Sequence, residues 1–310
     1  MQGLRISGFG HALPSTEISN DYLNPQTSEW VSTRLGINSR RYMSEDQTFL
    51  RLIADAAEQA LSSAKLKPEA IDGVIVATSS PDYLQPSTAA ILHGELGLHR
   101  NCMAFDIQAM CAGFIYGMGI AAGLMTNSKN GKWLLIGADQ YSKLADQNDR
   151  NKVFFGDGAA AMILERQNQQ NTSHFEFFSE GKGWASFQTD ARERKFKMNT
   201  REVYESATTK LPDAIRLACS KVGIEVRDIA NFFVHQPSKP VLDQLQSELN
   251  VSDEKFHRNL SLRANTAGAT IPLLFSETLG NGLQIPNNSW VCFAAIGAGW
   301  VWGVGLVQWV

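Results

Sequence analysis

The sequence predicts an α/β protein built from two copies of one unit, and three observations carry this prediction. The chain has 310 residues, 44% hydrophobic and 19% charged, which is typical of a globular protein of about two domains. Short apolar runs alternate with longer amphipathic ones, as strands and helices do in α/β proteins. Segments of the first half recur in the same order in the second half.

The internal repeat has an offset of about half the chain. Three pairs of segments match, at offsets of 158, 155 and 157 residues. They are IDGVIVATSSP from Ile71 with IANFFVHQPSK from Ile229, Ala112-Gly113 with Ala267-Gly268, and WLLIGAD from Trp133 with WVCFAAIGAG from Trp290. We therefore expect two similar halves, residues 1–166 and 167–310.

The apolar patterns place the main elements of both halves. Strands are expected at residues 73–78, 102–107, 133–137, 289–296 and 301–310, the first three buried on both faces. Helices are expected at residues 48–64, 88–96 with Ser87 as N-cap and Gly97 as stop, 201–222 with a break at Pro212, and 241–249. This alternation predicts mainly parallel sheets in a five-layered α/β/α/β/α body.

Charge and composition exclude several classes of function. The chain has 28 Lys and Arg against 31 Asp and Glu, so no positive field favours nucleic acid. The start has no apolar stretch typical of a secretory signal, which favours a cytoplasmic protein. The uncharged run 107–128 contains polar residues and glycines, which favours a helix buried inside the protein over a membrane span. The four cysteines lack metal-ligand spacing and indicate buried thiols, or one reactive thiol among three inert ones.

Cys111 is the candidate nucleophile. It follows the apolar strand that ends near Asp106 and stands at the first turn of the long apolar helix. Backbone N–H groups and the positive end of the helix dipole favour a thiolate at such a place. The alternative for a lone cysteine is a small buried apolar residue.

His235 and Asn265 favour the catalytic interpretation of Cys111. His235 ends the strand FFVHQPS, and Asn265 opens the helix NTAGATIP at the position that the repeat assigns to Cys111. The repeat therefore brings strand ends and helix starts from both halves to one edge of the sheets. That edge is where open α/β sheets bind ligands.

Several motifs together resemble the β-ketoacyl-acyl carrier protein synthase III group of the thiolase superfamily. They are FDIQAMCAGFIYG, FFVHQPSKPVLDQL, NLSLRANTAGATIPLL and IGAGWVWGVGLVQW, with EWVSTRLGINSRR and FFGDGAAA. The resemblance implies a thiolase-like duplicated fold and a homodimer. It also implies a decarboxylative Claisen condensation of an acyl-coenzyme A primer with a malonyl thioester, carried by acyl carrier protein, without a metal or other cofactor.

The same resemblance implies roles for individual residues. Cys111 would carry the acyl group, and His235 with Asn265 would promote decarboxylation. The backbone N–H groups of Cys111 and Ala298 would form the oxyanion hole. The remaining residues implied by the resemblance bind coenzyme A, and they are Trp30, Arg34 and Arg150. For Trp30, the alternative is a core aromatic residue of a short helix.

The chemistry explains these residue types. A thioester transfers its acyl group readily to a thiolate. Decarboxylation leaves an enolate, which neutral donors such as a histidine N–H and an asparagine amide stabilise in a dry site. A carboxylate at residue 265 would repel the enolate. The glycines of IGAGWVWG suggest a nucleotide loop, but an apolar run follows them, so we expect a second strand there. We interpret Gly156–Gly158 as a structural turn.

The sequence also departs from the family pattern. Pro237 to Pro240 replace the usual continuation with an arginine, and Glu205 and Glu248 weaken the expected patch for an acidic carrier protein. Leu84–Gln85 lacks the aromatic residue that closes the acyl pocket from the partner subunit, which predicts a primer larger than acetyl unless Phe155 or Trp184 refills the space.

These departures leave an alternative open: a specialised secondary-metabolite ketosynthase, or an acyltransferase with another acceptor. A cysteine hydrolase with the same Cys, His, Asn order does not explain the repeat. A non-catalytic subunit would be expected to lose Cys111 or His235.

Overall fold

Two β-sheets form the centre of the protein. The computed structural model describes residues 3–144, 150–167, 172–190, 192–193 and 195–310. The first sheet has, in spatial order, strands β1 (Gly3–Ala12), β7 (Gly158–Gln167), β6 (Lys132–Asp139), β4 (Gly73–Ala77) and β5 (Met103–Ile107). The second has β11 (Ile229–Val234), β12 (Trp290–Gly297), β13 (Val301–Gln308) and β8 (Ser173–Ser179).

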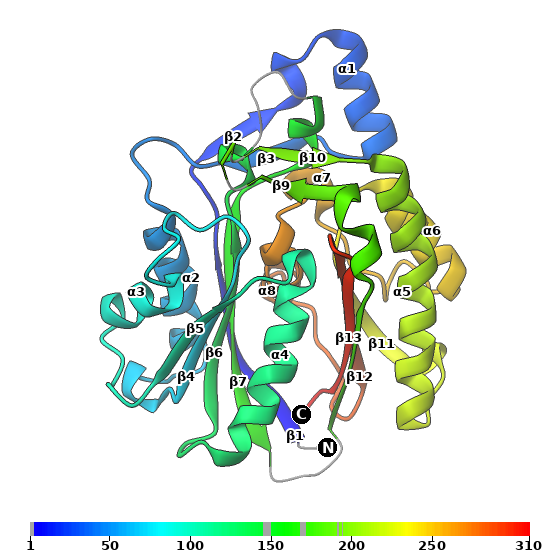
Figure 1. Ribbon diagram of the computed structural model, residues 1–310. Helices are drawn as coiled ribbons and strands as arrows, with labels where there is room; N and C mark the ends of the chain where they lie inside the picture. The colour runs from blue at the N-terminus through cyan, green and yellow to red at the C-terminus, as the bar shows by residue number, and fades with distance from the viewer. Residues whose placement is uncertain (1–2, 145–149, 168–171, 191, 194) are drawn as a thin grey trace.

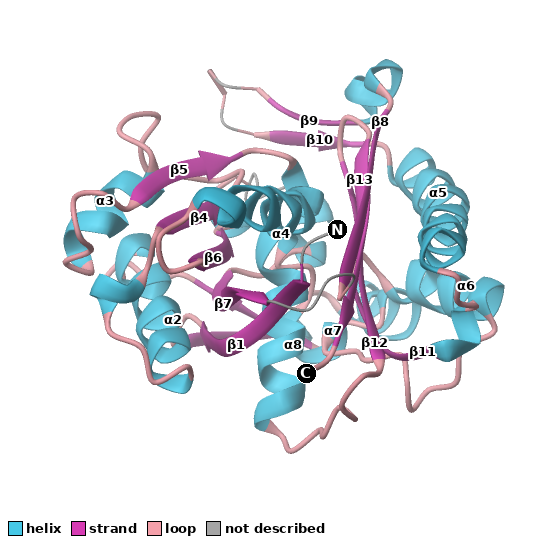
Figure 2. Ribbon diagram, turned by 90° about the horizontal axis from the view of Figure 1, so that it is seen from below, coloured by secondary structure: helices cyan, strands magenta, loops and turns pink. Residues whose placement is uncertain are grey.

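Helices cover both faces of each sheet and confirm the predicted five layers (Figures 1 and 2). The outer face of the first sheet carries α2 (Phe49–Ser63) and α3 (Thr88–Glu95). The outer face of the second sheet carries α5 (Thr200–Val222) and α6 (Lys239–Leu249). The layer between the sheets holds α4 (Gly113–Leu124) and α8 (Thr270–Gly280), so these helices are covered on both sides.

The apolar helix of the first half lies in this middle layer. Residues Met110–Asn127 are long and apolar enough to cross a membrane by length and composition, and 44% of this stretch is buried. Phe114, Ile115 and Met118 are fully buried, in one cluster with apolar residues of both sheets. The prediction of a helix packed inside the protein is confirmed.

The sheets are mixed, so the expectation of mainly parallel sheets is wrong. The parallel pairs are β4 with β5, β4 with β6, and β11 with β12. The strands β7 and β13 run antiparallel to both neighbours in their sheets. Residues 298–300, which join β12 to β13, are too few for the crossover that a parallel pair requires. Strand β5 is an edge strand with Met103 49% exposed, so its expected burial on both faces is also wrong.

Helix α5 continues through Pro212, and the predicted break is absent. Proline removes one hydrogen bond inside a helix. Leu211, Pro212 and Ile215 are buried in the core of the second half. Packing of this apolar face therefore outweighs the local preference of one residue.

The other helix ends follow their local signals. Ser87 Oγ accepts a hydrogen bond from Ala90 N at 3.2 Å, as an N-cap does. Gly97, expected as the stop of α3, has φ 62°, a backbone conformation that favours glycine. These two positions could be identified from the residue types alone.

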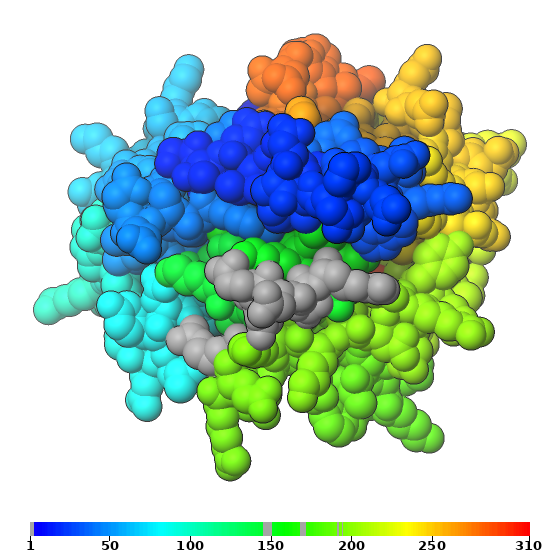
Figure 3. Space-filling model, turned by 90° about the horizontal axis from the view of Figure 1, so that it is seen from above, coloured from blue at the N-terminus to red at the C-terminus, as the bar shows by residue number. Residues whose placement is uncertain are grey.

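Smaller elements collect at the end of the molecule where the parallel strands finish (Figures 1 and 3). In the view from this end, the N-terminal segment runs as a blue band across the molecule. The elements are β2 (Thr16–Ser19), α1 (Pro25–Trp30), a π-helical turn η2 (Val31–Leu35), β3 (Ser39–Tyr42), β9 (Phe187–Thr189), β10 (Phe196–Met198) and α7 (Leu260–Arg263).

The 3-10 turns are distributed along the chain. They are η1 (Asn20–Tyr22), η3 (Pro68–Ala70), η4 (Met110–Ala112), η5 (Met125–Asn127), η6 (Tyr141–Lys143), η7 (Arg150–Phe154), η8 (Gly181–Ser186), η9 (Val226–Asp228) and η10 (Ala267–Ala269).

Candidate active site

Cys111 lies in the turn η4, between the end of β5 and the start of α4. The preceding residue, Met110, has φ 49°, which is unusual for a residue other than glycine. The turn lies against β12 of the other half, because a Cβ built on Gly297 would come within 2.9 Å of Cys111 N. The sharp turn thus presents the thiol at the interface of the two halves.

The environment of Cys111 does not favour the thiolate, contrary to the expectation from its place at a helix start. Burial raises the pKa of the Cys111 thiol, and the nearby carboxylate Asp139 raises it further. Both effects disfavour the charged form. In this closed site the nucleophile rests as a neutral thiol.

His235 follows β11 and is buried, with 3% of its surface exposed. Its backbone N donates to Ala294 O at 2.9 Å, which continues the pairing of β11 with β12. Burial lowers the pKa of His235 to about 3, so its imidazole is neutral. Its Nδ1 atom makes no hydrogen bond within the described residues. A neutral ring with an unused nitrogen suits a donor or acceptor role toward a ligand.

Asn265 precedes the turn η10 and is held on both sides. Its Oδ1 accepts from Ala267 N at 2.8 Å, so the oxygen end of the amide is engaged and the Nδ2 end is the donor. Its backbone N donates to Phe154 O at 2.9 Å, and its O accepts from Gly156 N at 3.0 Å. A Cβ at Gly156 would lie 2.4 Å from Arg263 O, so only glycine permits this approach.

The position of Asn265 in the repeat differs by a few residues from the expected one. The turns η4 and η10 begin at Met110 and Ala267, which both have positive φ, 49° and 48°. Cys111 therefore corresponds to Gly268, and Asn265 lies on the loop before the turn. The short matching pair Ala-Gly placed the alignment out of register by two residues.

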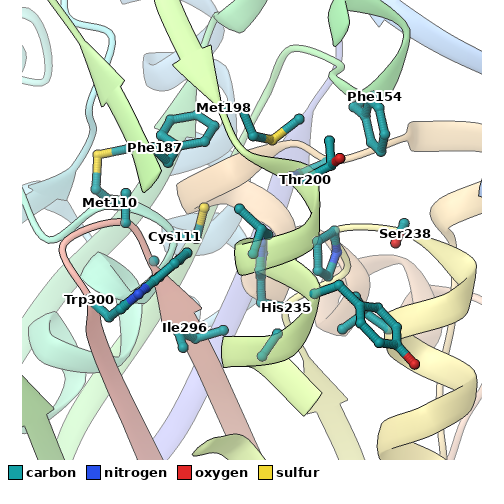
Figure 4. Close-up of a pocket in the computed structure, with 18 of the residues that line it drawn as sticks. Met110, Cys111, Phe154, Phe187, Met198, Thr200, His235, Ser238, Ile296 and Trp300 are labelled. Carbon is teal, nitrogen blue, oxygen red and sulfur yellow. The ribbon is translucent and has the colours of Figure 1, made fainter. Parts of the chain in front are cut away.

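Cys111, His235 and Asn265 line one cavity of about 70 Å³. In Figure 4, Met198, Thr200 and Phe154 lie on one side of this space and Ile296 on the other. The other residues that line the cavity are Phe155, Phe187, Val203, Tyr204, Ala207, Pro237, Ser238, Val241, Gly297, Ala298, Trp300 and Met110. Its wall is mainly apolar, which suits a short acyl group.

The turn between β12 and β13 closes the cavity beside Cys111. Ala298 is the first residue after β12 and lines the cavity. Residues 301–308 form the strand β13, which confirms the predicted second strand after the glycines. Trp300, the last residue of the turn, is buried against Gly183, where a Cβ would lie 2.2 Å from Trp300 Nε1.

Of the residues expected to bind coenzyme A, Trp30 lies next to this cavity. Trp30 is 37% exposed and stands edge-on to Phe154, with ring centroids 6.2 Å apart. Phe154 itself lines the cavity. Arg34 is exposed on η2, one turn after Trp30. Arg150 begins η7, but its side chain lies outside the described part of the structure.

Two buried carboxylates support the site and were not singled out in the sequence. Asp139, at the end of β6, accepts from Ser79 N and Gly268 N, both at 2.8 Å, and thus connects the two halves. Asp157 accepts from Met43 N at 2.8 Å and from Ser142 N at 2.9 Å. Burial raises the pKa of Asp157 to about 6. The turn Gly156–Gly158 is structural, as expected, but it directly supports Asn265.

Comparisons with known proteins identify the family of this chain. Residues 105–181 match the family described as 3-oxoacyl-[acyl-carrier-protein (ACP)] synthase III, and residues 219–309 match its C-terminal region. The β-ketoacyl-[acyl-carrier-protein] synthase III of Rickettsia canadensis is 34% identical over 316 residues, which cover 98% of this chain and 99% of the relative.

Solved structures extend the comparison to the fold. The 3-oxoacyl-[acyl-carrier-protein] synthase III of Aquifex aeolicus VF5 is 31% identical with a TM-score of 0.92, covering 99% of this chain and 100% of that one. The priming β-ketosynthase of the R1128 polyketide biosynthetic pathway is 26% identical with a TM-score of 0.93, covering 99% and 96%.

Proposed function

Since this chain belongs to the β-ketoacyl-[acyl-carrier-protein] synthase III family of condensing acyltransferases, we propose that it condenses an acyl-coenzyme A primer with a malonyl thioester. The observation that carries the proposal is the convergence of Cys111, His235 and Asn265 on one apolar cavity. The residue types and their burial support a division of the reaction into two steps.

In the first step, the sulfur of Cys111 attacks the thioester carbonyl of the primer. A carbon–sulfur bond forms to Cys111, the bond to coenzyme A breaks, and coenzyme A leaves as a thiol with the proton of Cys111. The backbone N–H groups of Cys111 and Ala298 are proposed to stabilise the oxyanion of this step. Both residues line the cavity, which supports this role.

In the second step, the malonyl thioester loses carbon dioxide, and the electron pair of the broken bond forms an enolate. The enolate carbon attacks the acyl carbonyl, the bond to Cys111 breaks, and the Cys111 thiolate takes a proton from solvent. His235 is neutral because burial lowers its pKa to about 3, and Asn265 has Oδ1 engaged with Ala267 N. The neutral state of both side chains supports a role as hydrogen-bond donors to the enolate oxygen.

We assign the entrance for coenzyme A to the side of the cavity near Trp30. An indole and a guanidinium suit an adenine ring and phosphates. The edge-on contact of Trp30 with Phe154 and the exposure of Arg34 support this assignment. Lys239 lies next to η2, since a Cβ on Gly36 would come within 2.7 Å of its Cβ. Coenzyme A is a substrate in this proposal, and the reaction uses no metal or other cofactor.

The partners of the enzyme are part of the proposal. We infer that the malonyl group arrives on acyl carrier protein and that the enzyme is a cytoplasmic homodimer without nucleic-acid or membrane partners. Strand β5 is a sheet edge with Met103 49% exposed, and Leu84 in the neighbouring loop is 94% exposed. An apolar edge of this kind favours pairing with a second copy. Sedimentation of a monomer at micromolar concentration would contradict the dimer.

A second function is favoured by the surface near the entrance. Lys239 is paired with Asp243, and Arg201, near Tyr204 of the cavity wall, is paired with Glu205, so neither cation is left for an acidic carrier protein. The similarity to a priming ketosynthase of a polyketide pathway supports a specialised ketosynthase; the other form of this alternative is an acyltransferase that passes the acyl group to a different acceptor. Product analysis with malonyl-acyl carrier protein tests the acyltransferase form of this alternative, because a ketosynthase forms a β-ketoacyl product from it and an acyltransferase with another acceptor does not.

The experiment that tests the proposal is intact-mass measurement after incubation with a panel of acyl-coenzyme A thioesters. The wild-type enzyme should gain the mass of one acyl group, and Cys111→Ala should gain none. Cys102→Ala is the matched control, since Cys102 is a buried thiol outside the cavity, and it should acylate normally. Acylation of the Cys111→Ala variant would refute the proposal.

A further inference from the structure

A partly buried acidic side chain outside the cavity connects the loops that carry His235 and Asn265. Glu277 lies on α8, and its side chain is 14% exposed. Its Oε1 accepts from Arg263 Nε at 2.7 Å, and its Oε2 accepts from Asn259 Nδ2 at 2.9 Å. These two donors stand at the two ends of α7, the short helix between the His235 and Asn265 loops.

The same chain of hydrogen bonds reaches the residue next to His235. Gln236 is fully buried, and its Oε1 accepts from Asn259 N at 3.1 Å and from Leu260 N at 3.3 Å. Its Nε2 donates to Asn259 Oδ1. The path Gln236, Asn259, Glu277 is therefore continuous, and every contact in it is a hydrogen bond between defined atoms.

The other branch of the network leads to Asn265. Arg263 is the last residue of α7 and lies two residues before Asn265, with Ala264 between them at φ 56°. Asn265 is thus bracketed by α7 on one side and by α8, which carries Glu277, on the other. We propose that Glu277 is a positioning residue that fixes His235 and Asn265 relative to each other for decarboxylation. This inference rests on the proposed function of that pair.

The network requires a carboxylate at residue 277. Both partners, Asn259 Nδ2 and Arg263 Nε, are donors, so residue 277 needs two acceptor atoms. The variant Glu277→Gln has the same size but places an NH2 group against one of the donors. One branch of the network then opens, while the packing of α8 remains the same.

The test separates the two steps of the reaction. For Glu277→Gln we expect kcat for condensation with malonyl-acyl carrier protein to fall roughly tenfold, because misplacement of a catalytic group by less than 1 Å has effects of this order. The KM for malonyl-acyl carrier protein and the rate of Cys111 acylation should stay unchanged. The control is Glu165→Gln. Glu165 forms an ion pair with Arg5 at 3.7 Å, and its side chain, 19% exposed, is about as exposed as that of Glu277.

Further variants keep the test decisive. Arg263→Lys keeps the charge but loses the Nε contact, and it should show the same selective loss if Glu277→Gln does not fold. The losses of Glu277→Gln and Asn259→Ala should be less than additive in the double variant, because both act through one path. A parallel fall in acylation, condensation and thermal stability would indicate only a structural role and overturn the inference.

The outcome also distinguishes this inference from the proposed function. If Asn265→Ala loses condensation and Glu277→Gln keeps the wild-type rate, Glu277 has no positioning role and the proposed function remains. If Asn265→Ala itself condenses normally, the proposed function fails, and the role of Glu277 fails with it.

Discussion

In the first half, the turn η4 brings the thiol of Cys111 into the cavity; in the second half, the matching turn η10 has Gly268 at the corresponding position. Gly268 has no side chain to present, and its N–H donates to Asp139 Oδ2 at 2.8 Å. A Cβ there would lie 2.9 Å from the same carboxylate oxygen. The second half contributes chemistry from Asn265 on the preceding loop instead. Two turns of the same shape thus have different roles: we propose a catalytic role for η4 and a structural role for η10.

Each turn lies against the other half of the molecule. The turn η4 packs on Gly297 at the end of β12, and η10 packs on Gly137 near the end of β6. The two sheets also differ at one edge. The first sheet has the strand β5 there, whereas the second has only an isolated bridge between Phe232 and Phe256. The shared geometry fixes where the two turns meet, and among the described residues the second sheet ends at β11 with no strand that corresponds to β5.

The largest effect on the rate of condensation should come from substitution of Asn265, the residue that the second half contributes from the loop before η10. Asn265→Ala should lower condensation by about 10²–10³, the usual loss for one donor of an oxyanion-type site, and His235→Ala should behave alike. Both variants should still acylate Cys111. Asn265→Asp keeps the acceptor for Ala267 N but replaces the donor by a carboxylate, so it should be at least as impaired. Product formation and intact mass measure the two steps; condensation near the wild-type rate would exclude the role of Asn265.

Asp157, next to the residue that bonds Asn265, should make the stability of the protein depend on pH. Burial raises the pKa of Asp157 to about 6 in the folded protein, above its ordinary value of 3.8. The folded state then binds the proton more tightly, so this group's contribution to the free energy of unfolding falls as pH rises from about 4 to about 6. The change is up to about 3 kcal/mol, from about 1.4 kcal/mol per pKa unit.

The variant Asp157→Asn removes this titration. We expect the unfolding free energy of the wild type, measured by urea denaturation, to fall relative to that of Asp157→Asn as the pH rises from about 4 to about 6. A difference that stays constant from pH 4 to pH 7 would show that Asp157 does not titrate there.

The two glycines under the turns allow the halves to be disturbed separately. A Cβ would lie 2.2 Å from Gly268 O at residue 137, and 2.7 Å from Met110 Cβ at residue 297. Each alanine variant should lose about 1–3 kcal/mol of stability through overpacking. Gly297→Ala should slow acylation, whereas Gly137→Ala should slow condensation and leave acylation unchanged.

Gly123→Ala is the matched control for these variants. Gly123 lies in α4 with no atom within 4 Å of the added Cβ, so alanine should stabilise the helix by up to about 1 kcal/mol without changing either rate. Thermal unfolding and the two half-reactions measure the effects. Equal effects of Gly137→Ala and Gly297→Ala on both steps would contradict the separate tasks of the turns.

The sequence predicts much of this comparison, and its failures have physical causes. Strand runs, helix caps and the candidates Cys111 and His235 follow from local residue patterns. Asn265 is singled out through a repeat alignment that is out of register, because the short pair Ala-Gly does not fix the alignment. The network around Glu277 does not, because its members are far apart in sequence and meet only after α7 and α8 pack. The raised pKa of Cys111 depends on burial and on Asp139, which local helix position does not include.

The smallest effect concerns the choice of primer. The cavity of about 70 Å³ within one chain accommodates the first carbons of an acyl group beside Cys111. Phe155 lines it, whereas Trp184 is 60% exposed and Leu84 and Gln85 are not among its lining residues. A longer chain must extend beyond this cavity, toward the place where we expect the loop of a second copy.

That loop offers Leu84, 94% exposed in one chain, in place of an aromatic side chain. We therefore expect octanoyl-coenzyme A to acylate Cys111 at least as fast as acetyl-coenzyme A, since each buried methylene contributes about 0.8 kcal/mol, roughly fourfold in rate. Leu84→Phe should reverse the preference, and Tyr83→Phe, in the same loop, should not. Competition between the two donors, followed by intact mass, measures the ratio. Exclusive acetylation of the wild-type enzyme would show that the residues around Cys111 in one chain, Phe155 among them, set the primer length by themselves.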